Sequence, residues 1–144
     1  MMIQLKQLLE KKGAGAVTLA ESASVGEAIR TMYQHRVGSV LISSVSGTPL
    51  GIFTERDVMR LCAEGKHDFD NLSIKDHMTT ELVLGKPEDR VTEVLGIMTE
   101  KRFRHIPIVK DGQIVGMVSI GDLVKAKLEE TVQEAEALRN YIIS

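Results

Sequence analysis

The chain has 144 residues, 43% of them hydrophobic and 26% charged, with a formal net charge of −2 and one cysteine. This length and composition predict one compact domain whose core can form without disulfides or metal. The slightly acidic balance argues against a broad nonspecific nucleic-acid surface, which requires a basic face, and a single cysteine excludes an intrachain disulfide.

The first part of the chain predicts alternating helices and strands. Apolar spacing and turn residues predict a helix over 3–11, a strand over 16–19, a helix over 25–36, strands over 40–42 and 50–53, and a helix that begins after Thr54. Ser24 with Glu27 three positions later is typical of a helix N-cap. Cys62 lies in an apolar run of the last of these helices and is predicted to be buried.

Residues 65–78 are polar and poorly periodic, and we expect them to form a linker. After it the same kinds of pattern predict a strand over 82–84, a helix over 91–101, strands over 106–109 and 114–118, and a last helix that Ser119 opens. Asp111-Gly112 between the last two strands is a strong hairpin signal.

The two parts are copies of each other. GIFTERD at 51–57 matches GMVSIGD at 116–122, and VGEAIRTM at 25–32 matches VTEVLGIM at 91–98. The offset is 98 − 32 = 66 for the helices but 122 − 57 = 65 for the endings, so the second copy is one residue shorter in its hairpin. An internal repeat of this length decides the fold prediction.

Each copy predicts a β-α-β-β-α unit, and one such unit alone leaves a sheet face uncovered. We therefore expect an α+β fold in which two three-stranded sheets pack face to face about a pseudo-twofold axis. The predicted segments are an N-terminal helix and lead-in over 1–15, a first repeat over 16–64, a linker over 65–78, a second repeat over 79–128 and a C-terminal helix extension over 129–144.

Each copy ends in a hydroxyl and a carboxylate at the start of a helix. Thr54 precedes Asp57 by three positions, and Ser119 precedes Asp122 in the same way. A helix N-terminus favours anions and polar ligand groups, and a carboxylate can accept hydrogen bonds from the two vicinal hydroxyls of a ribose. The alternative is that the same spacing forms only a capping box within the helix.

The paired endings, the strand RHIPIV at 104–109 and the linker between the copies resemble a tandem cystathionine-β-synthase (CBS) domain pair, or Bateman module, over roughly residues 16–128. The chain is similar to the small stand-alone bacterial CBS-pair proteins, which end in a long helix like 123–143 here. The resemblance implies a regulatory homodimer that binds an adenine nucleotide (AMP, ADP, ATP, NAD or S-adenosylmethionine) and is not an enzyme. It also implies an effector protein that the module regulates in trans.

The resemblance implies two ligand sites, each with its aspartate from one repeat and its facing residues from the other. The Asp122 site would comprise Met117, Ser119, Ile120 and Asp122, facing Gly15, Ala16, Val17, Val37, Gly38 and Ser39. The Asp57 site would comprise Ile52, Thr54, Arg56 and Asp57, facing Thr80, Leu82, Phe103, Arg104, His105 and Pro107.

Phosphate groups require cations, and Arg104, His105 and Arg56 are the candidates, since arginine suits phosphate through its bidentate fork. The alternative for Arg56 is a solvated position on the helix surface, and the alternative for His105 is a structural hydrogen bond. Leu41 stands where the second copy has Pro107, so the two sites should differ in shape.

The last helix carries a stripe that its own module is too short to cover: Val124, Leu128, Val132 (with Thr131), Ala135, Leu138 and Ile142. Pairing with the same helix of a second chain is the first expectation, and packing on the N-terminal helix is the alternative.

The chain predicts no metal site, because its four histidines show no ligand spacing and it has one cysteine. No apolar stretch approaches the ~20 residues of a membrane span, and the N-terminus lacks the apolar segment of a secretion signal, so we expect a cytoplasmic protein.

Three other functions remain open at this point. They are a protein-interaction module with vestigial nucleotide sites, an enzyme that acts on the bound nucleotide, and a nucleic-acid-binding protein. The absence of a visible nucleophile–base pair disfavours the second, and the net charge disfavours the third.

Overall fold

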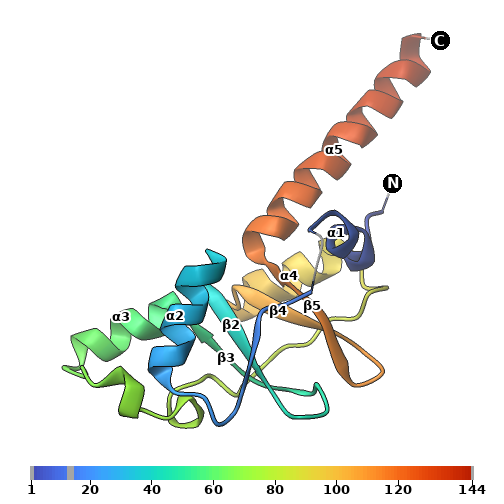
Figure 1. The fold of residues 1–144 in the computed structure, drawn as a ribbon. Helices are drawn as coiled ribbons and strands as arrows, with labels where there is room; N and C mark the ends of the chain where they lie inside the picture. The colour runs from blue at the N-terminus through green and yellow to red at the C-terminus, as the bar shows by residue number, and fades with distance from the viewer. Residues whose placement is uncertain (1, 13–14, 144) are drawn as a thin grey trace. The chain divides into compact units, whose positions relative to one another are not determined.

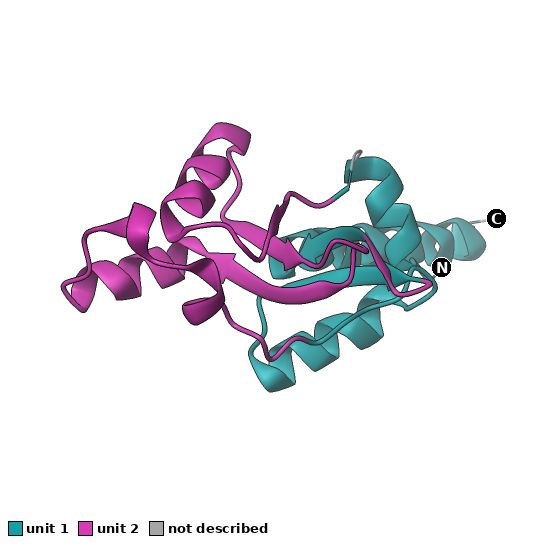
Figure 2. Cartoon of the chain, turned by 60° about the horizontal axis from the view of Figure 1, so that its bottom comes forward, with its two compact units in different colours: residues 1–15, 83–110, 115–144 teal, residues 16–82, 111–114 magenta. Residues whose placement is uncertain are grey.

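The computed structural model describes residues 2–12 and 15–143, which divide into two compact units (Figure 2). Unit 1 consists of Met1–Gly15, Val83–Lys110 and Val115–Ser144, and unit 2 of Ala16–Leu82 and Asp111–Ile114. Helices and strands occur in both units, so the predicted α+β class is confirmed. The units are described one at a time below.

Unit 2 contains the first repeat as a three-stranded sheet with its helices (Figure 1). Strand β1 (Thr18–Ala20) pairs in parallel with β2 (Ser39–Ser43), and β2 pairs antiparallel with β3 (Pro49–Thr54). Helix α2 (Val25–His35) connects the first two strands, and α3 (Glu55–Ala63) follows the third. The strands and helices predicted for this repeat are confirmed to within two residues.

Local signals set the ends of α2 as expected. Ser24 is the N-cap, and its hydroxyl accepts a hydrogen bond from the Glu27 N–H at 3.0 Å. Arg36 ends the helix in the left-handed conformation with φ of 55°. The inward face of α2 joins the core of unit 2, whose buried members are Ala23, Val25, Ala28, Met32, Val40, Ile42, Phe53, Leu61 and Ile74.

The segment predicted as a linker packs onto unit 2. It forms two short 3-10 helices, η1 (Phe69–Asn71) and η2 (Ile74–Asp76), and the Ile74 side chain is fully buried. The Ile74 N–H donates to the Ala23 carbonyl at 3.0 Å. Further along, Thr79 forms an antiparallel bridge with Ile52 of β3, with both N–H···O distances 2.9 Å. One apolar residue in a polar stretch was too weak a signal to predict this packing.

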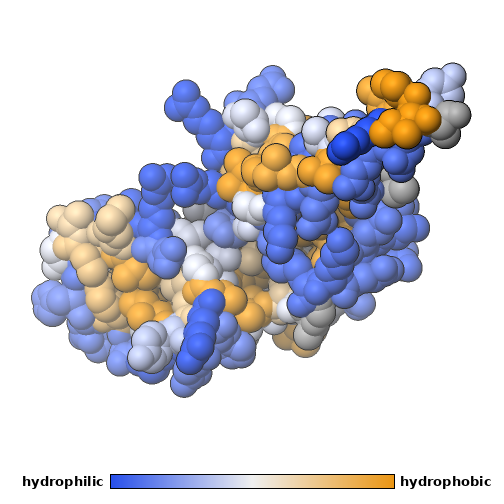
Figure 3. Space-filling model, turned by 90° about the horizontal axis from the view of Figure 1, so that it is seen from above, coloured by the Kyte–Doolittle hydropathy of each residue, from blue (hydrophilic) through white to orange (hydrophobic). Residues whose placement is uncertain are grey.

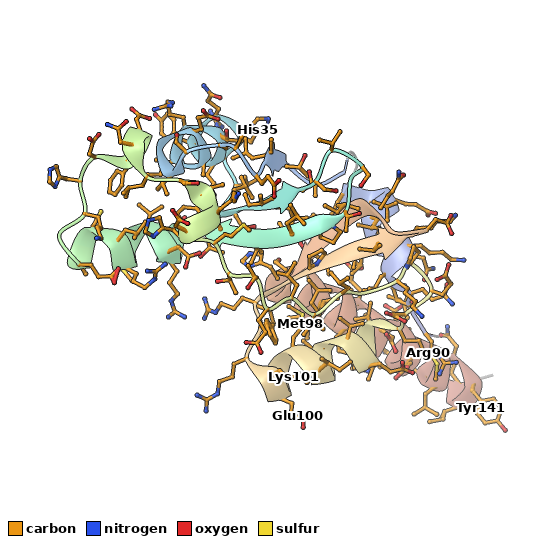
Figure 4. All side chains as sticks on the ribbon, turned by 90° about the horizontal axis from the view of Figure 1, so that it is seen from below. His35, Arg90, Met98, Glu100, Lys101 and Tyr141 are labelled. Atoms are coloured by element: carbon orange, nitrogen blue, oxygen red, sulfur yellow. The ribbon has the colours of Figure 1, made fainter. Side chains whose placement is uncertain are left out.

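Unit 1 contains most of the second repeat together with both terminal helices. It comprises α1 (Leu5–Lys12), α4 (Val91–Lys101), β4 (His105–Lys110), all but the first two residues of β5 (Gln113–Ser119), and α5 (Ile120–Ile143). In Figure 4 the Met98 side chain lies on the inner side of α4, whereas Glu100 and Lys101 point outward. The buried core members are Leu5, Leu8, Val91, Val94, Met98, Ile106, Ile108, Val118, Leu123 and Ala126.

The strand predicted over 82–84 is wrong, because only Gly85 forms a bridge, parallel to Ile108. In the first repeat the Leu41 N–H donates to the Val17 carbonyl at 3.0 Å, which holds β1 beside β2. Pro107 stands at the position of Leu41 in the second repeat, and proline has no N–H to donate. The sheet of unit 1 therefore has two strands, β4 and β5.

The predicted burial of Cys62 is also wrong, since its side chain is exposed. Leu61, one position earlier, is the residue of α3 that enters the core, with 0% exposure. The next residue on a helix is turned by about 100°, so Cys62 points to solvent.

The hairpin turn predicted at Asp111-Gly112 is confirmed. Both residues have positive φ, 53° and 78°, as a two-residue hairpin turn requires. This tip belongs to unit 2, where the Ile114 N–H donates to the Gly47 carbonyl at 3.1 Å.

Helix α5 has 24 residues, and only its first half packs onto the rest of unit 1. Leu123, Ala126 and Glu130 are buried, whereas every described residue from 131 onward is exposed. Figure 1 shows this second part of α5 extending past α1 and α4. In the described part of the chain no helix is both long and apolar enough to span a membrane.

Candidate functional site: two carboxylates at helix N-termini

The first Ser/Thr-x-x-Asp motif lies where β3 passes directly into α3. Thr54 is the N-cap, with extended backbone, and its hydroxyl accepts a hydrogen bond from the Asp57 N–H at 3.3 Å. The Asp57 carboxylate in turn accepts from the Thr54 N–H at 2.9 Å and from the Thr54 hydroxyl at 3.1 Å, both through Oδ2. This reciprocal pair is a capping box.

The second oxygen of Asp57 faces Arg60, one turn further along α3. The distance from an Arg60 guanidinium nitrogen to Asp57 Oδ1 is 3.5 Å, long for a hydrogen bond. The same guanidinium also donates to Glu64 at 3.2 Å. Asp57 is largely buried, with 17% of its side chain exposed. One carboxylate oxygen is thus committed to the helix start and the other only weakly held.

The second motif repeats this geometry where β5 passes into α5. The Asp122 Oδ2 atom accepts from the Ser119 N–H at 2.9 Å, and the Ser119 hydroxyl accepts from the Asp122 N–H at 3.1 Å. The capping interpretation of both motifs is therefore correct as far as it goes. It does not exclude ligand binding, because a carboxylate has more acceptor positions than one cap uses.

Asp122 has an additional partner that Asp57 lacks among the described residues. The ammonium group of Lys12, at the end of α1, donates to Asp122 Oδ2 at 2.7 Å and to the Met117 carbonyl at 3.0 Å. The side chains of Lys12 and Asp122 are 43% and 27% exposed. Lys12 therefore lies across the second motif, where a ligand hydroxyl would also have to bind.

The environment of Asp122 favours its charged form. Partial burial acts to raise the pKa of Asp122, but the hydrogen bond from Lys12, the backbone N–H of Ser119 and the Lys12 charge outweigh it, and the pKa is lowered below its ordinary value. An ionised carboxylate at neutral pH is the form that accepts hydrogen bonds from sugar hydroxyls.

The start of each helix is hydrogen-bonded to the residue just before the first strand of the hairpin in its own repeat, β2 or β4. In unit 2 the Glu55 N–H donates to the Gly38 carbonyl at 3.0 Å, and in unit 1 the Ile120 N–H donates to the Arg104 carbonyl at 2.9 Å. The two repeats therefore build the same frame around their aspartates. A Cβ atom on Gly38 would lie 3.1 Å from a Glu55 carboxylate oxygen, so glycine there admits the Glu55 side chain.

The remaining predicted site residues divide between the units. Unit 2 holds, beside Thr54 and Asp57, the residues Ala16, Val17, Val37, Gly38, Ser39, Ile52, Arg56, Thr80 and Leu82. Unit 1 holds, beside Ser119 and Asp122, the residues Gly15, Phe103, Arg104, His105, Pro107, Met117 and Ile120. Within unit 2 the Ile52–Thr79 bridge places the residue before Thr80 beside β3.

The candidate phosphate-binding residues differ in exposure. Arg56 and Arg104 are exposed, and His105 is half-buried with an interaction inside the chain. Arg56 lies on the first turn of α3, one position before Asp57.

Each unit has a surface hollow, and only the one in unit 1 is lined by a candidate aspartate. In unit 2 a groove of about 810 Å³ lies between α2 and α3, lined by Ile29, Met32, Tyr33, Gln34, Arg36, Val37, Gly38, Glu55 and Val58. In unit 1 a cavity of about 150 Å³ lies between α1 and α5, lined by Leu8, Lys11, Lys12, Asp122, Lys125, Ala126 and Glu129. The second hollow is polar and contains the candidate aspartate; the first contains Val37 and Gly38 but not Asp57.

Two residues at the motifs were missed from the sequence. Arg60 was predictable, because residues three apart on a helix are neighbours and an arginine there faces Asp57. Lys12 was not, since it lies 122 − 12 = 110 positions before Asp122 and no local pattern connects them. Among the described residues no group of His, Cys, Asp or Glu could hold a metal ion.

Comparison with known proteins identifies the family. The CBS domain model matches residues 14–64 and 74–129, which covers both repeats and most of the chain. The chain therefore belongs to the CBS-domain family, as the sequence resemblance predicted. It is a CBS pair: one polypeptide with two copies of the domain.

Individual relatives agree. A mitochondrial CBS domain-containing protein of Arabidopsis thaliana, CBSX3, is 37% identical over 123 residues, which span 83% of this chain but only 60% of that protein. A solved CBS-domain protein from Agrobacterium tumefaciens is 37% identical with a TM-score of 0.79, covering 86% of this chain and 92% of that one. A CBS domain protein from Pyrobaculum aerophilum, solved with AMP, is 27% identical with a TM-score of 0.73, covering 83% and 89%.

Proposed function

We propose that this CBS pair is a regulatory module that binds an adenine nucleotide, with Asp57 and Asp122 as the groups that accept the ribose hydroxyls. The observation that carries the proposal is the duplicated geometry: two carboxylates, each on the first turn of a helix and each with one oxygen held by its own cap. The AMP bound by the Pyrobaculum aerophilum relative supports the choice of ligand class.

The chemistry of each motif suits a neutral diol next to an anion. The caps fix the carboxylate orientation before any ligand arrives, which lowers the entropy lost on binding. The positive end of the helix dipole favours the phosphate of the same ligand. AMP, ADP, ATP, NAD and S-adenosylmethionine share the adenosine part that this site would recognise.

The proposal keeps the two residue sets that the resemblance implies. Gly15, Ala16, Val17, Val37, Gly38 and Ser39 would complete the Asp122 site, and Thr80, Leu82, Phe103, Arg104, His105 and Pro107 the Asp57 site. The module would be a homodimer that transmits ligand binding to an effector protein in trans, and it would not turn the nucleotide over. A ligand that binds one conformation better shifts the population toward it, and a partner can sense that shift.

A second candidate is a protein-interaction module whose nucleotide sites are vestigial. One observation favours it: Lys12 already neutralises the Asp122 carboxylate within the chain. In that case both aspartates would serve as helix caps alone.

A thermal-shift screen separates the two candidates. Purified chain is heated with AMP, ADP, ATP, NAD, S-adenosylmethionine or GTP, in parallel with Asp57→Asn and Asp122→Asn. A ligand at 100 times its Kd adds about 2.7 kcal/mol to the free energy of unfolding, which for a domain of this size is several degrees. The proposal predicts such a rise with an adenine ligand, lost in one or both variants; no rise with any of them in folded protein favours the interaction module.

A further inference from the structure

The C-terminal part of α5 carries a row of exposed apolar side chains. Val124, Leu128 and Leu138 are 44%, 62% and 61% exposed, and Ile142 is 73% exposed. The helix is nevertheless regular from Ile120 to Ile143. Figure 3 shows hydrophobic surface at the free end of this helix. Large exposed apolar patches usually mark interaction sites, so we expect a partner to cover this row.

The N-terminal helix does not cover this row. Leu5 and Leu8 of α1 belong to the same core cluster as Leu123 and Ala126, which lie on another face of α5. Helix α1, the alternative partner for the exposed row, therefore packs against the buried face of α5 instead.

The spacing of the row matches a two-stranded coiled coil. With Thr131 in the row and its exposed neighbour Val132 beside it at an e position, the members follow one another at steps of four, three, four, three and four: Val124, Leu128, Thr131, Ala135, Leu138 and Ile142. This is the a/d pattern of a heptad repeat, with Leu128, Ala135 and Ile142 at a. A β-branched residue at a beside leucine at d, as in Ile142 and Leu138, favours two parallel strands. Thr131 and Ala135 are small and let two helices approach closely.

The charged residues beside the row favour a parallel over an antiparallel pair of α5 helices. In a parallel pair the g residue faces the e residue five positions later on the other helix, so Glu134 faces Arg139 of the partner subunit, twice by symmetry. In the antiparallel pair that matches Leu128 with Leu138, Glu134 would face its own copy and Lys125 would face Arg139. Like charges in these positions are destabilising. Glu134 also has an interaction within its own chain, so the new ion pair supplements or replaces it.

We propose that residues 124–142 of α5 form a parallel, in-register two-stranded coiled coil with the same helix of a second copy of this chain. This gives the homodimer of the proposed function a definite interface and orientation. The coiled coil does not depend on ligand binding, since no residue of the row belongs to either candidate site.

Disulfide trapping tests the orientation. The exposed Cys62 is first replaced by serine, and Leu138→Cys is introduced. A parallel in-register pair brings the two 138 positions together at a Cα separation that a disulfide can span, about 4.4–6.8 Å. Mild oxidation should then yield mostly covalent dimer, whereas the matched variant Gln133→Cys, on the opposite face of the helix, should remain uncrosslinked. Crosslinking of Leu128→Cys/Leu138→Cys without crosslinking of Leu138→Cys would show an antiparallel pair and overturn the proposal.

Sedimentation velocity of the whole chain tests the interface itself. Leu138→Asp should raise the dimer Kd at least tenfold, while Val45→Asp, a fully exposed apolar residue of unit 2, should leave it unchanged. Arg139→Glu should weaken the dimer and Glu134→Arg/Arg139→Glu should restore it. A wild-type monomer, or a dimer indifferent to Leu138→Asp in a protein with unchanged helicity, would overturn the proposal. Because adenine-nucleotide thermal shifts are measured on the same variants, loss of the dimer is distinguishable from loss of ligand binding.

Discussion

The two Ser/Thr-x-x-Asp motifs have the same internal hydrogen bonds but different coverings. In unit 2 the strand before the motif is bridged by Thr79, which directly follows the predicted linker. In unit 1 the corresponding strand lies against Leu9 of α1, and Lys12 of the same helix reaches the aspartate. Residues just after the linker thus cover the first motif, and α1, which precedes the first repeat, covers the second.

This difference shows which properties the repeat itself determines. The backbone geometry at the helix start is the same in both copies, because it follows from the capping residues. The charge around each carboxylate differs, because Lys12 from α1, which is not repeated, approaches Asp122, whereas Asp57 faces Arg60 of its own helix. Asp57 is left with a long contact to Arg60 and Asp122 with a short one to Lys12. The two sites are therefore expected to differ in affinity even though their motifs match.

The largest contrast is expected from alanine at the glycine that opens each motif. A Cβ on Gly51 would lie 3.0 Å from the Thr79 carbonyl, which is backbone, whereas a Cβ on Gly116 would press on the end of the Leu9 side chain, which can move. Gly51→Ala should lower the free energy of unfolding by about 1–3 kcal/mol, and Gly116→Ala by less. Urea denaturation of both variants measures this; equal losses would mean that α1 is as rigid a cover as the segment at 79.

Removing Lys12 should change ligand affinity moderately and at one site. Lys12→Met removes the ammonium group from Asp122 Oδ2, which then keeps the hydrogen bond from the Ser119 N–H. A half-exposed ion pair of this kind contributes about 0.2–1 kcal/mol. Adenosine, which has no phosphate to attract the lysine, should bind about 1.4- to 5-fold more tightly. Isothermal titration measures the change. Lys11→Met, which breaks the neighbouring pair with Glu129, is the matched control and should have no effect.

The smallest expected effect concerns stability in acid. The pKa of Asp122 is lowered in the folded chain, so its ion pair stabilises the protein fully above the ordinary carboxyl pKa of about 4 and loses this contribution as the pH falls through the lowered value. Between pH 5 and pH 3 the wild type should therefore lose more stability than Lys12→Met, by under about 1 kcal/mol because the pair is partly exposed. Urea midpoints at the two pH values provide the comparison, and identical losses would show that the pair contributes nothing.

Local patterns predicted the parts of the fold that local interactions determine. Ser24 caps α2 and Asp111-Gly112 turns the hairpin because each acts on its own backbone. The repeat located both aspartates at helix starts for the same reason.

Cys62 and Arg60 were misjudged within a single helix, where local spacing could have corrected both. The other failures involve partners that are distant in sequence. Pro107 removes a donor that a strand around residue 83 would need, and that loss shows only when the parallel neighbour is known. Ile74 is a single apolar residue whose burial depends on the core it meets. The contact of Lys12 with Asp122 depends on how α1 packs against α5, which no periodicity within either helix specifies.

The central claim, that the two carboxylates bind ribose hydroxyls, is tested most directly by changing the ligand and the protein together. Binding of AMP and of its 2′,3′-dideoxy analogue is measured by isothermal titration on the wild type, Asp57→Asn and Asp122→Asn. A hydrogen bond to a charged group contributes about 1.5–3 kcal/mol, so the dideoxy analogue should bind the wild type at least tenfold more weakly. Replacement of the aspartate that holds the ribose should abolish most of this difference. Equal binding of the two ligands to the wild type would contradict the account.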